Sequence, residues 1–415
     1  MKTILFFSTL TLWSLGKGKG GPAFTKTIEA YQADGWDVYL ISDEPQNKDC
    51  SLLDEAHNIC LPPSVFKPLT HRRFISQPFK LLDQLSMVHR FGKAAQRILG
   101  SRPGPCIAYA YEVHGVAPCA GVARKYHLPM VTRFQGTVLC DKKLNLVNRY
   151  RWIPHFSALA HPADLVIMTN DGTQGDRVLK ELGNNSKTLF YLNGLELLEM
   201  DLPAMKAGFD RAAFLRGISE KISPEECVFL TVSRLASWKR VDRCIVGFAE
   251  YCRKNPAGKL VIVGEGDQRQ ALETLAEGLG IRERVFFVGS VEHRRVYDYM
   301  LACDVFLSLY DLSNVGNPLL EAMTLGKCIV TLDVGDTRNF IQDKQNGVLL
   351  TADRLDDLGE TMSLLANAPL LRVQYGSAAE SFSREHFWTW KDRMHSEVEN
   401  VEQLLAVPGR RPLDK

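Results

Sequence analysis

Short apolar runs alternate along the chain with amphipathic stretches of about 10 to 15 residues. Such an apolar run is typical of a buried strand, and apolar residues that recur every three or four positions are typical of a helix. Strands that alternate with helices form parallel sheets covered by helices on both faces. The pattern therefore predicts an α/β protein built from doubly wound, Rossmann-like parallel sheets.

Two series of apolar runs are predicted to be strands. In the first half of the chain they span residues 3–9, 36–41, 106–111, 130–134, 165–169 and 188–192. In the second half they span residues 227–233, 259–263, 285–288, 305–308, 328–332 and 347–350. Because open parallel sheets bind ligands beyond the carboxyl ends of their strands, two such sheets are expected to face each other across a functional cleft.

The chain of 415 residues has the length of two ordinary domains. Residues 200–226 contain no run typical of a strand, so the junction is predicted there, between domains of residues 1–200 and 201–385. Residues 354–406 have a helical pattern throughout. The last segment, 386–415, is expected to be a C-terminal helix that packs back toward the first domain.

Composition and charge narrow the class of protein. Hydrophobic residues make up 45% of the chain, charged residues 24%, and the net charge is +2. This balance is typical of a globular protein and not of one that coats nucleic acid. Residues 1–200 contain 23 Lys and Arg against 17 Asp and Glu, and the remainder contains 27 against 31, so the first half is the basic one.

The ten cysteines show neither Cys-x-x-Cys spacing nor the nearby His residues of a zinc site. They are expected to be reduced thiols of a cytoplasmic protein. The first residues, "MKTILFFSTLTLWSLG", leave a secretory signal open as an alternative to a buried first strand. No apolar stretch approaches the ~20 residues that a membrane-spanning helix needs.

Two cations follow the predicted strand 227–233. Arg234 comes directly after it, and Lys239 lies in the short loop before the next helix. A forked guanidinium and a compact ammonium together suit a diphosphate, although a pair of solvated surface cations is the commoner arrangement. Gly289 follows another strand, where backbone groups have room to lie against a flat base.

A further candidate site begins at Gly316, Asn317 and Pro318, where a helix is predicted to start. Amides at a helix N-terminus attract phosphate, and proline is well suited to the first helical position. Glu321 is expected in the first turn, where the helix dipole favours a carboxylate. The functional alternative is that Glu321 accepts hydrogen bonds from a pair of ribose hydroxyls.

Five segments occur in a recognisable order and spacing: "VSRLASWKRVD", "LVIVGEGDQR", "VFFVGSV", "VFLSLY" and "GNPLLEAMTLGKCIVTLDVGDTRNFI". Together they resemble the nucleotide-sugar domain of the retaining glycosyltransferases of family 4, which have the GT-B fold. "FYLNGLE" is similar to the end of the first domain in that family. "GKGKGGPAFTKTIEAYQADGWDVYLIS", which contains Gly20 and Gly21, resembles its first glycine-rich loop and helix.

The resemblance implies an acceptor-side first domain and a second domain that binds the nucleotide-sugar donor. It implies that Arg234 and Lys239 hold the donor diphosphate, and that Glu321 binds the ribose. It also implies a retaining, metal-independent transfer with no cofactor, and UDP-sugar is expected over GDP-sugar because UDP is common in the family. The other donor-binding candidates are Gly20, Gly21, Gly289, Asp311, Ser313, Asn314, Gly316, Asn317 and Pro318.

The sequence departs from the family pattern of two glutamates separated by seven residues. Ser313 stands eight positions before Glu321, where the first glutamate is expected. Either Asp311 supplies the carboxylate, or "SNVGN" contacts the donor sugar through hydroxyl, amide and backbone groups. The second alternative is slightly favoured.

The first half contains another departure. Gln135 stands where relatives commonly have a His beside the reacting sugar, and a glutamine cannot transfer a proton. The leaving phosphate oxygen is able to take the acceptor's proton in a front-face transfer, so positioning and phosphate stabilisation are expected to dominate. Glu112 and His114 follow a predicted strand and are acceptor-side candidates, although ordinary packing roles are more common for such residues.

Residues 67–102 contain eight Lys and Arg against one acid, Asp83, interleaved with apolar residues. This pattern is typical of a basic amphipathic helix on an anionic membrane surface, and equally of a solvated helix. The first interpretation predicts peripheral association with the inner face of the membrane and a saccharide or lipid-linked acceptor for polysaccharide or glycoconjugate synthesis. A non-catalytic GT-B protein that binds a nucleotide sugar or a partner transferase is the competing function.

Overall fold

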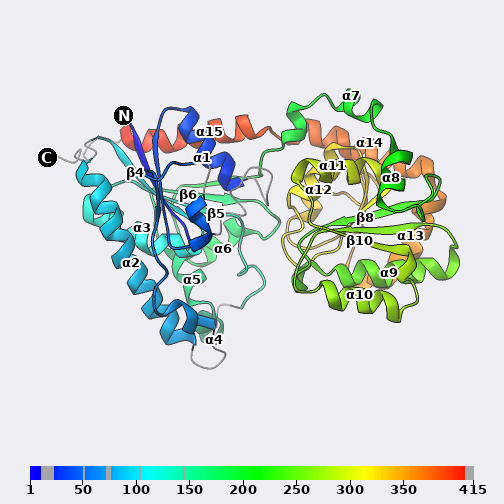
Figure 1. Cartoon of the computed structure of the whole chain (residues 1–415), viewed down its shortest axis with the longest axis horizontal. Coiled ribbons are helices and arrows are strands. Elements are labelled where there is room, and N and C mark those ends of the chain that lie inside the picture. The colour runs from blue at the N-terminus through cyan, green and yellow to red at the C-terminus, as the bar shows by residue number, and fades with distance from the viewer. Residues whose placement is uncertain (11–22, 50–51, 72–75, 102–103, 144, 407–415) are drawn as a thin grey trace. The chain divides into compact units, whose positions relative to one another are not determined.

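The computed structural model describes residues 1–10, 23–49, 52–71, 76–101, 104–143 and 145–406 (Figure 1). The chain divides into two compact units. The first contains residues 1–170, 174–193 and 390–415, and the second contains residues 171–173 and 194–389. The boundary therefore lies between residues 193 and 194, earlier than the expected boundary after residue 200, and the loop 171–173 belongs to the second unit.

The first unit is built on a seven-stranded parallel sheet of strand order β3-β2-β1-β4-β5-β6-β7. The order reverses beside β1, because β2 and β4 pair with its two edges. The strands are β1 (Thr3–Phe7), β2 (Asp37–Ser42), β3 (Asn58–Cys60), β4 (Cys106–Tyr111), β5 (Met130–Phe134), β6 (Leu165–Thr169) and β7 (Thr188–Tyr191).

Helices cover both faces of this sheet, as Figure 1 shows. Alternate residues of β1 serve the two faces: Leu5 and Phe7 belong to the core beneath α2 and α3, and Ile4 and Phe6 belong to the core beneath α1 and α15. The helices are α1 (Ala23–Ala33), α2 (Ser76–Ser101), α3 (Val113–Tyr126), α4 (Leu146–Arg151), α5 (Ile153–Ala160), α6 (Gly175–Glu181) and α15 (Trp390–Glu402), and a short 3-10 helix, η3 (Lys67–His71), precedes α2.

A buried ionic network fixes α15 to the first unit. Glu397 of this helix pairs with Arg393 one turn away and with Arg133 of β5, whose Nη1 lies 3.4 Å from Glu397 Oε2. The hydroxyl of Tyr109 donates to Glu397 Oε1 at 2.7 Å. Burial raises the pKa of Glu397, but the two guanidiniums outweigh burial and hold it below its usual value. The C-terminal helix is thus part of the first unit, although 196 residues of the second unit precede it in the chain between 194 and 389.

The second unit repeats the architecture with a six-stranded parallel sheet of order β10-β9-β8-β11-β12-β13. In Figure 1, α9 and α10 lie on one face and α11 and α12 on the other. The strands are β8 (Val228–Val232), β9 (Lys259–Val263), β10 (Val285–Gly289), β11 (Val305–Ser308), β12 (Cys328–Leu332) and β13 (Val348–Leu350). The helices are α7 (Leu202–Ala207), α8 (Arg211–Ile218), α9 (Val241–Lys254), α10 (Arg269–Gly278), α11 (His293–Ala302), α12 (Asn317–Thr324), α13 (Leu358–Asn367) and α14 (Pro369–His386).

All twelve predicted strands are present, so the expected α/β class with two Rossmann-like sheets is confirmed. The sequence pattern missed β3, a three-residue edge strand. Between residues 200 and 226 the structure has the helices α7 and α8 and no strand. None of the helices in the described ranges is long and apolar enough to cross a membrane.

Candidate functional site

A small cavity of about 140 Å³ lies at the carboxyl ends of β8 and β11 in the second unit. These two strands are neighbours at the point where the strand order reverses, the usual ligand site of a doubly wound sheet. Its lining residues are Val232, Ser233, Arg234, Lys239, Tyr310, Asn314, Gly316, Pro318 and Leu319. The cavity therefore brings together five of the residues that the sequence selected for donor binding.

The charge of this cavity comes from Arg234 and Lys239. Lys239, at the end of the 3-10 helix η5 (Ser237–Lys239), donates from Nζ to the backbone oxygen of Ser313 at 3.3 Å and lies 4.1 Å from the ring centre of Tyr310. Within the described ranges, neither cation forms a salt bridge. Desolvation lowers the pKa of Lys239 to about 8; the carboxylate of Asp171 opposes that lowering, and the charge of Arg234 adds to it. An anion bound here would offset the repulsion between the two cations.

The N-terminus of α12 forms another wall of the cavity. Gly316 is the residue before the helix and has no side chain to cap it, and Pro318 occupies the first turn. The helix dipole and the amides at this end favour a phosphate group. The two cationic side chains and the N-terminus of α12 therefore border the same small cavity, and each of them favours an anion there.

The loop that leads into α12 is held by its own polar side chains. Asn314 accepts from the backbone nitrogen of Tyr310 at 3.1 Å and donates to the backbone oxygen of the same residue at 2.9 Å. Asp311 pairs with Arg240 at 3.2 Å and with Arg243 at 2.6 Å. Both side chains therefore stabilise the loop through these contacts.

Ser313 has a left-handed backbone conformation, with φ at 60°. Its side chain hydrogen-bonds the carboxylate of Asp171, which belongs to the loop 171–173 of the second unit. Asp171 also accepts from Thr173 Oγ1 at 2.5 Å, and its backbone oxygen accepts from Val315 at 3.0 Å. A buried carboxylate thus lies beside the position where the family's first glutamate is missing.

Asp171 is buried, and desolvation raises the pKa of its carboxyl group even though Thr173, Ser313 and Lys239 favour the charged form. Sequence reasoning missed this residue, because it is distant from Ser313 along the chain. The one available indication was "NDGT" directly after the predicted strand 165–169, where a ligand loop is expected.

Glu321 is the fifth residue of α12, and the first turn of that helix contains no acid. The expectation of a first-turn carboxylate stabilised by the dipole is therefore wrong. Glu321 is only 2% exposed and its Oε1 lies 2.7 Å from Nε2 of His293, the first residue of α11. Sequence reasoning also missed His293, which connects Glu321 to the loop after β10.

Gly289 ends β10 with φ at 86°, a conformation that favours glycine. Its backbone oxygen accepts from Gly264 at 2.8 Å. A Cβ atom on Gly264 would overlap the backbone oxygen of Ser233, so only glycine allows the loops after β8 and β9 to approach so closely. These glycines pack the loops around the cavity, and neither Gly289 nor Glu321 lines it.

In the first unit, Gln135 and Glu112 form one polar cluster at the ends of β5 and β4. The amide of Gln135 donates from Nε2 to the hydroxyl of Tyr111 at 2.5 Å, and its backbone nitrogen donates to Glu112 Oε1 at 2.6 Å. Glu112 has a φ of 69°, an unusual conformation for a non-glycine residue. His114 instead lines a separate, larger cavity of the first unit.

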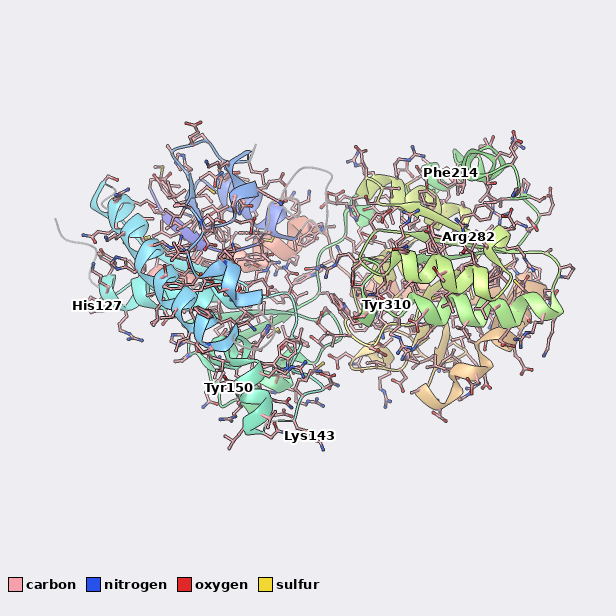
Figure 2. The ribbon with its side chains drawn as sticks, turned by 60° about the horizontal axis from the view of Figure 1, so that its bottom comes forward. His127, Lys143, Tyr150, Phe214, Arg282 and Tyr310 are labelled. Carbon is pink, nitrogen blue, oxygen red and sulfur yellow. The ribbon has the colours of Figure 1, made fainter. Side chains whose placement is uncertain are left out.

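Some predicted residues are not covered by the structure. Gly20 and Gly21 lie outside the described residues, as do residues 72–75 of the basic segment. Arg102, the last residue of that segment, also lies outside the described residues, and the described part forms η3 and α2, where Met87 and Phe91 are buried and Leu81, Leu82 and Leu85 are exposed. Figure 2 shows Tyr150 and Lys143 at the end of the first unit formed by α4, and Tyr310 within the second unit.

Two doubly wound parallel-sheet units define the GT-B fold of glycosyltransferases. Residues 218–382 match the family model of "Glycosyl transferases group 1", so this part of the chain is similar to that family. Alpha-monoglucosyldiacylglycerol synthase from Streptococcus pneumoniae is 26% identical over 199 residues, 46% of this chain and 44% of the relative. Across four curated relatives the match spans between 39% and 56% of the relative's length.

Solved structures support the same fold over nearly the whole chain. Sucrose-phosphate synthase from Thermosynechococcus elongatus has a TM-score of 0.75 and 18% identity, with 98% of this chain and 100% of that chain covered. The Alr3699/HepE protein of Anabaena, solved in complex with UDP and glucose, has a TM-score of 0.69 and 19% identity, with 96% and 99% covered. At this level of identity the likeness establishes the GT-B fold.

Proposed function

We propose that the protein is a retaining glycosyltransferase that transfers a sugar from a nucleoside diphosphate, UDP rather than GDP, to a hydroxyl acceptor without a metal ion. The observation that carries this proposal is the convergence of Arg234, Lys239 and the start of α12 on one small cavity. Two cations and a helix N-terminus suit a diphosphate, which is the leaving group of such a donor.

In the proposed reaction the bond between the sugar C1 and the diphosphate oxygen breaks. The acceptor oxygen forms the new bond to C1 on the same face, and the acceptor's proton passes to the leaving phosphate oxygen. Arg234 and Lys239 stabilise the charge that develops on that diphosphate, so they supply the electrostatic role that a divalent ion has in other transferases. Gln135, which cannot transfer a proton, is assigned a positioning role with Glu112 and Tyr111.

Recognition of the donor sugar is assigned to Asp171 together with Ser313. Of the three candidates in the loop before α12, Asp311 and Asn314 are engaged by other residues, whereas Ser313 contacts the Asp171 carboxylate. A carboxylate is the group that the family pattern requires near the sugar hydroxyls. Glu321, held by His293, is assigned the ribose hydroxyls, and a uridine nucleotide is favoured because Alr3699/HepE was solved with UDP.

We further propose that the transfer takes place at an anionic membrane surface, in the synthesis of a polysaccharide or glycoconjugate. Leu81 and Leu85 of α2 are 55% and 59% exposed, and Leu146 and Val147 of α4 are 85% and 73% exposed. Exposed leucines beside basic residues are typical of interfacial helices. The streptococcal relative is named as a synthase of a diacylglycerol glycolipid, which agrees with a lipid-linked acceptor.

A panel of UDP- and GDP-sugars tests the proposal against the non-catalytic alternative. Binding is measured by thermal shift and turnover by nucleotide release with candidate acceptors, in buffer that contains a chelator. We expect a UDP-sugar to bind and to release UDP. Tight donor binding without turnover for any acceptor would favour the non-catalytic protein.

A further inference from the structure

Each cation of the small cavity in the second unit lies over an aromatic ring. The guanidinium carbon of Arg234 is 5.3 Å from the ring centre of Trp238, and Nζ of Lys239 is 4.1 Å from that of Tyr310. Both distances are within the ~6 Å at which the face of a ring attracts a cation through its quadrupole. The two cations that are assigned to the donor diphosphate are thus both in contact with uncharged aromatic partners.

Arg234 depends on this contact more than Lys239 does. Among the described residues, its guanidinium forms neither a hydrogen bond nor a salt bridge, and Trp238 is the ring that it lies against. Arg234 is also exposed. An exposed arginine without a polar partner occupies many rotamers, so a ligand that fixes it loses affinity through conformational entropy. A ring that holds the guanidinium before the ligand binds reduces this loss.

The backbone between Arg234 and Trp238 is fixed by the neighbouring loop. Leu235 is fully buried, and its backbone nitrogen donates to the backbone oxygen of Glu265 at 2.9 Å. The backbone oxygen of Leu235 accepts from the backbone nitrogen of Gln268 at 3.0 Å. The positions from which the guanidinium and the indole ring extend are therefore set by the loops after β8 and β9.

The residue next to Lys239 shows the other way in which this unit holds a cation. Arg240 pairs with Asp242 at 2.8 Å and with Asp311 at 3.2 Å, and it is not among the described residues that line the cavity. Its two carboxylate partners neutralise its charge. A carboxylate beside Arg234 would do the same and would compete with the diphosphate, whereas an aromatic ring attracts a cation without a formal charge of its own.

We propose that Trp238 is a positioning residue of the donor site, whose ring holds the Arg234 guanidinium in place for the diphosphate and leaves its charge available. This inference rests on the proposed function. Trp238 is not among the described residues that line the cavity, so its effect on the ligand passes through Arg234. Its backbone oxygen also accepts from the backbone nitrogen of Asp311 at 3.0 Å, which connects η5 with the loop before α12.

The test titrates UDP against the full chain and its variants. Trp238→Leu keeps an apolar side chain and removes the aromatic face, so we expect the Kd for UDP to increase about two- to fivefold, the size of a cation–π contact at an exposed site. Trp238→Phe retains a ring and should stay within about twofold of the intact protein. The matched control is Val246→Ala, at a residue of α9 that is 45% exposed, and we expect no change there.

A double-mutant cycle shows whether Trp238 acts through Arg234. Arg234→Ala has no guanidinium to hold, so adding Trp238→Leu to it should cause no further loss of UDP affinity. A ring that contacted the nucleotide directly would give the same loss in both backgrounds. Because Trp238 is 39% exposed, the fold tolerates its replacement, and the Tm of each variant is measured to verify this.

Three results would overturn this inference alone: an unchanged Kd in Trp238→Leu, equal weakening by Trp238→Leu and Trp238→Phe, or a loss that persists in the Arg234→Ala background. Absence of UDP binding to the intact protein, or an unchanged Kd in Arg234→Ala, would overturn the proposed donor site and this inference with it. The two failures are therefore distinguished by the same set of titrations.

Discussion

Each of the two units has a cavity at the carboxyl ends of its central strands, yet the chemistry of the two cavities differs. In the second unit it is small, about 140 Å³, and its lining among the described residues includes Arg234 and Lys239 and no carboxylate. In the first unit it is large, about 900 Å³, and its described lining residues include three carboxylates and three cations. The fold thus fixes where each cavity lies, and the side chains fix the chemistry of its walls.

The largest expected effect is the loss of the cations from the small cavity. Arg234→Ala and Lys239→Ala are each expected to lower kcat about 10²- to 10³-fold, because each removes a group that stabilises charge on the leaving diphosphate. UDP release with a fixed donor measures this. Lys254→Ala, an exposed cation of α9 paired with Glu360, is the matched control and is expected to be neutral. Similar losses in all three variants would contradict a specific diphosphate site.

Asp171→Asn is expected to lower kcat/KM for the donor sugar about 10- to 100-fold, since a charged hydrogen bond is replaced by a neutral one. UDP without a sugar should bind nearly as before, because Asp171 is assigned to the sugar and not to the nucleotide. Titrations of UDP and of the UDP-sugar against both proteins separate these effects. Equal weakening of both ligands would show that Asp171 only supports the fold of the loop.

The pH dependence of donor binding is the next effect in size. Since the pKa of Lys239 is lowered to about 8, its charge is lost as the pH rises through 8, and the Kd for UDP should increase by up to about tenfold per pH unit above that value. Unfolding does not explain such a loss. The unfolded chain binds the Lys239 proton more tightly than the folded protein does. Lys239 therefore raises the free energy of unfolding as the pH rises from 8 toward 10.5.

The control for this pH effect is Lys239→Arg. A guanidinium stays protonated throughout this range, so the variant should bind UDP with little change between pH 7 and 9. A wild-type affinity that is equally flat over this range would contradict the assignment of Lys239 to the diphosphate.

The smallest expected effect concerns the proposed binding of the first unit to a membrane surface. Replacing Leu81 and Leu85 by Ser should weaken binding to vesicles of phosphatidylglycerol and phosphatidylcholine by about three- to tenfold, because partly exposed leucines contribute only a fraction of their full burial energy. Leu364→Ser, which is 59% exposed on α13, is the matched control in the second unit. Equal binding of both variants in a sedimentation assay would argue against the interfacial role of α2.

Sequence reasoning recovered the fold because strands buried on both faces produce continuous apolar runs in the sequence. Every strand except the short β3 coincides with such an apolar run. It also selected Arg234, Lys239, Asn314, Gly316 and Pro318, which line one cavity, since they follow predicted strands in the part of the chain that carries the family resemblance. It could not find Asp171, because a loop far away in the sequence completes the second unit. The lining of the larger cavity was equally hidden, since its walls come from elements that are separate in the sequence.

The most direct test of the donor site is titration calorimetry of UDP against the intact protein and against Lys239→Ala, at pH 7 with a chelator present. We expect UDP to bind the intact protein without a divalent ion, and the variant to bind at least tenfold more weakly, because a charge-assisted contact to the diphosphate is lost. Absence of UDP binding to the intact protein, or equal affinity of the two proteins, would contradict the proposal that this cavity holds the donor diphosphate.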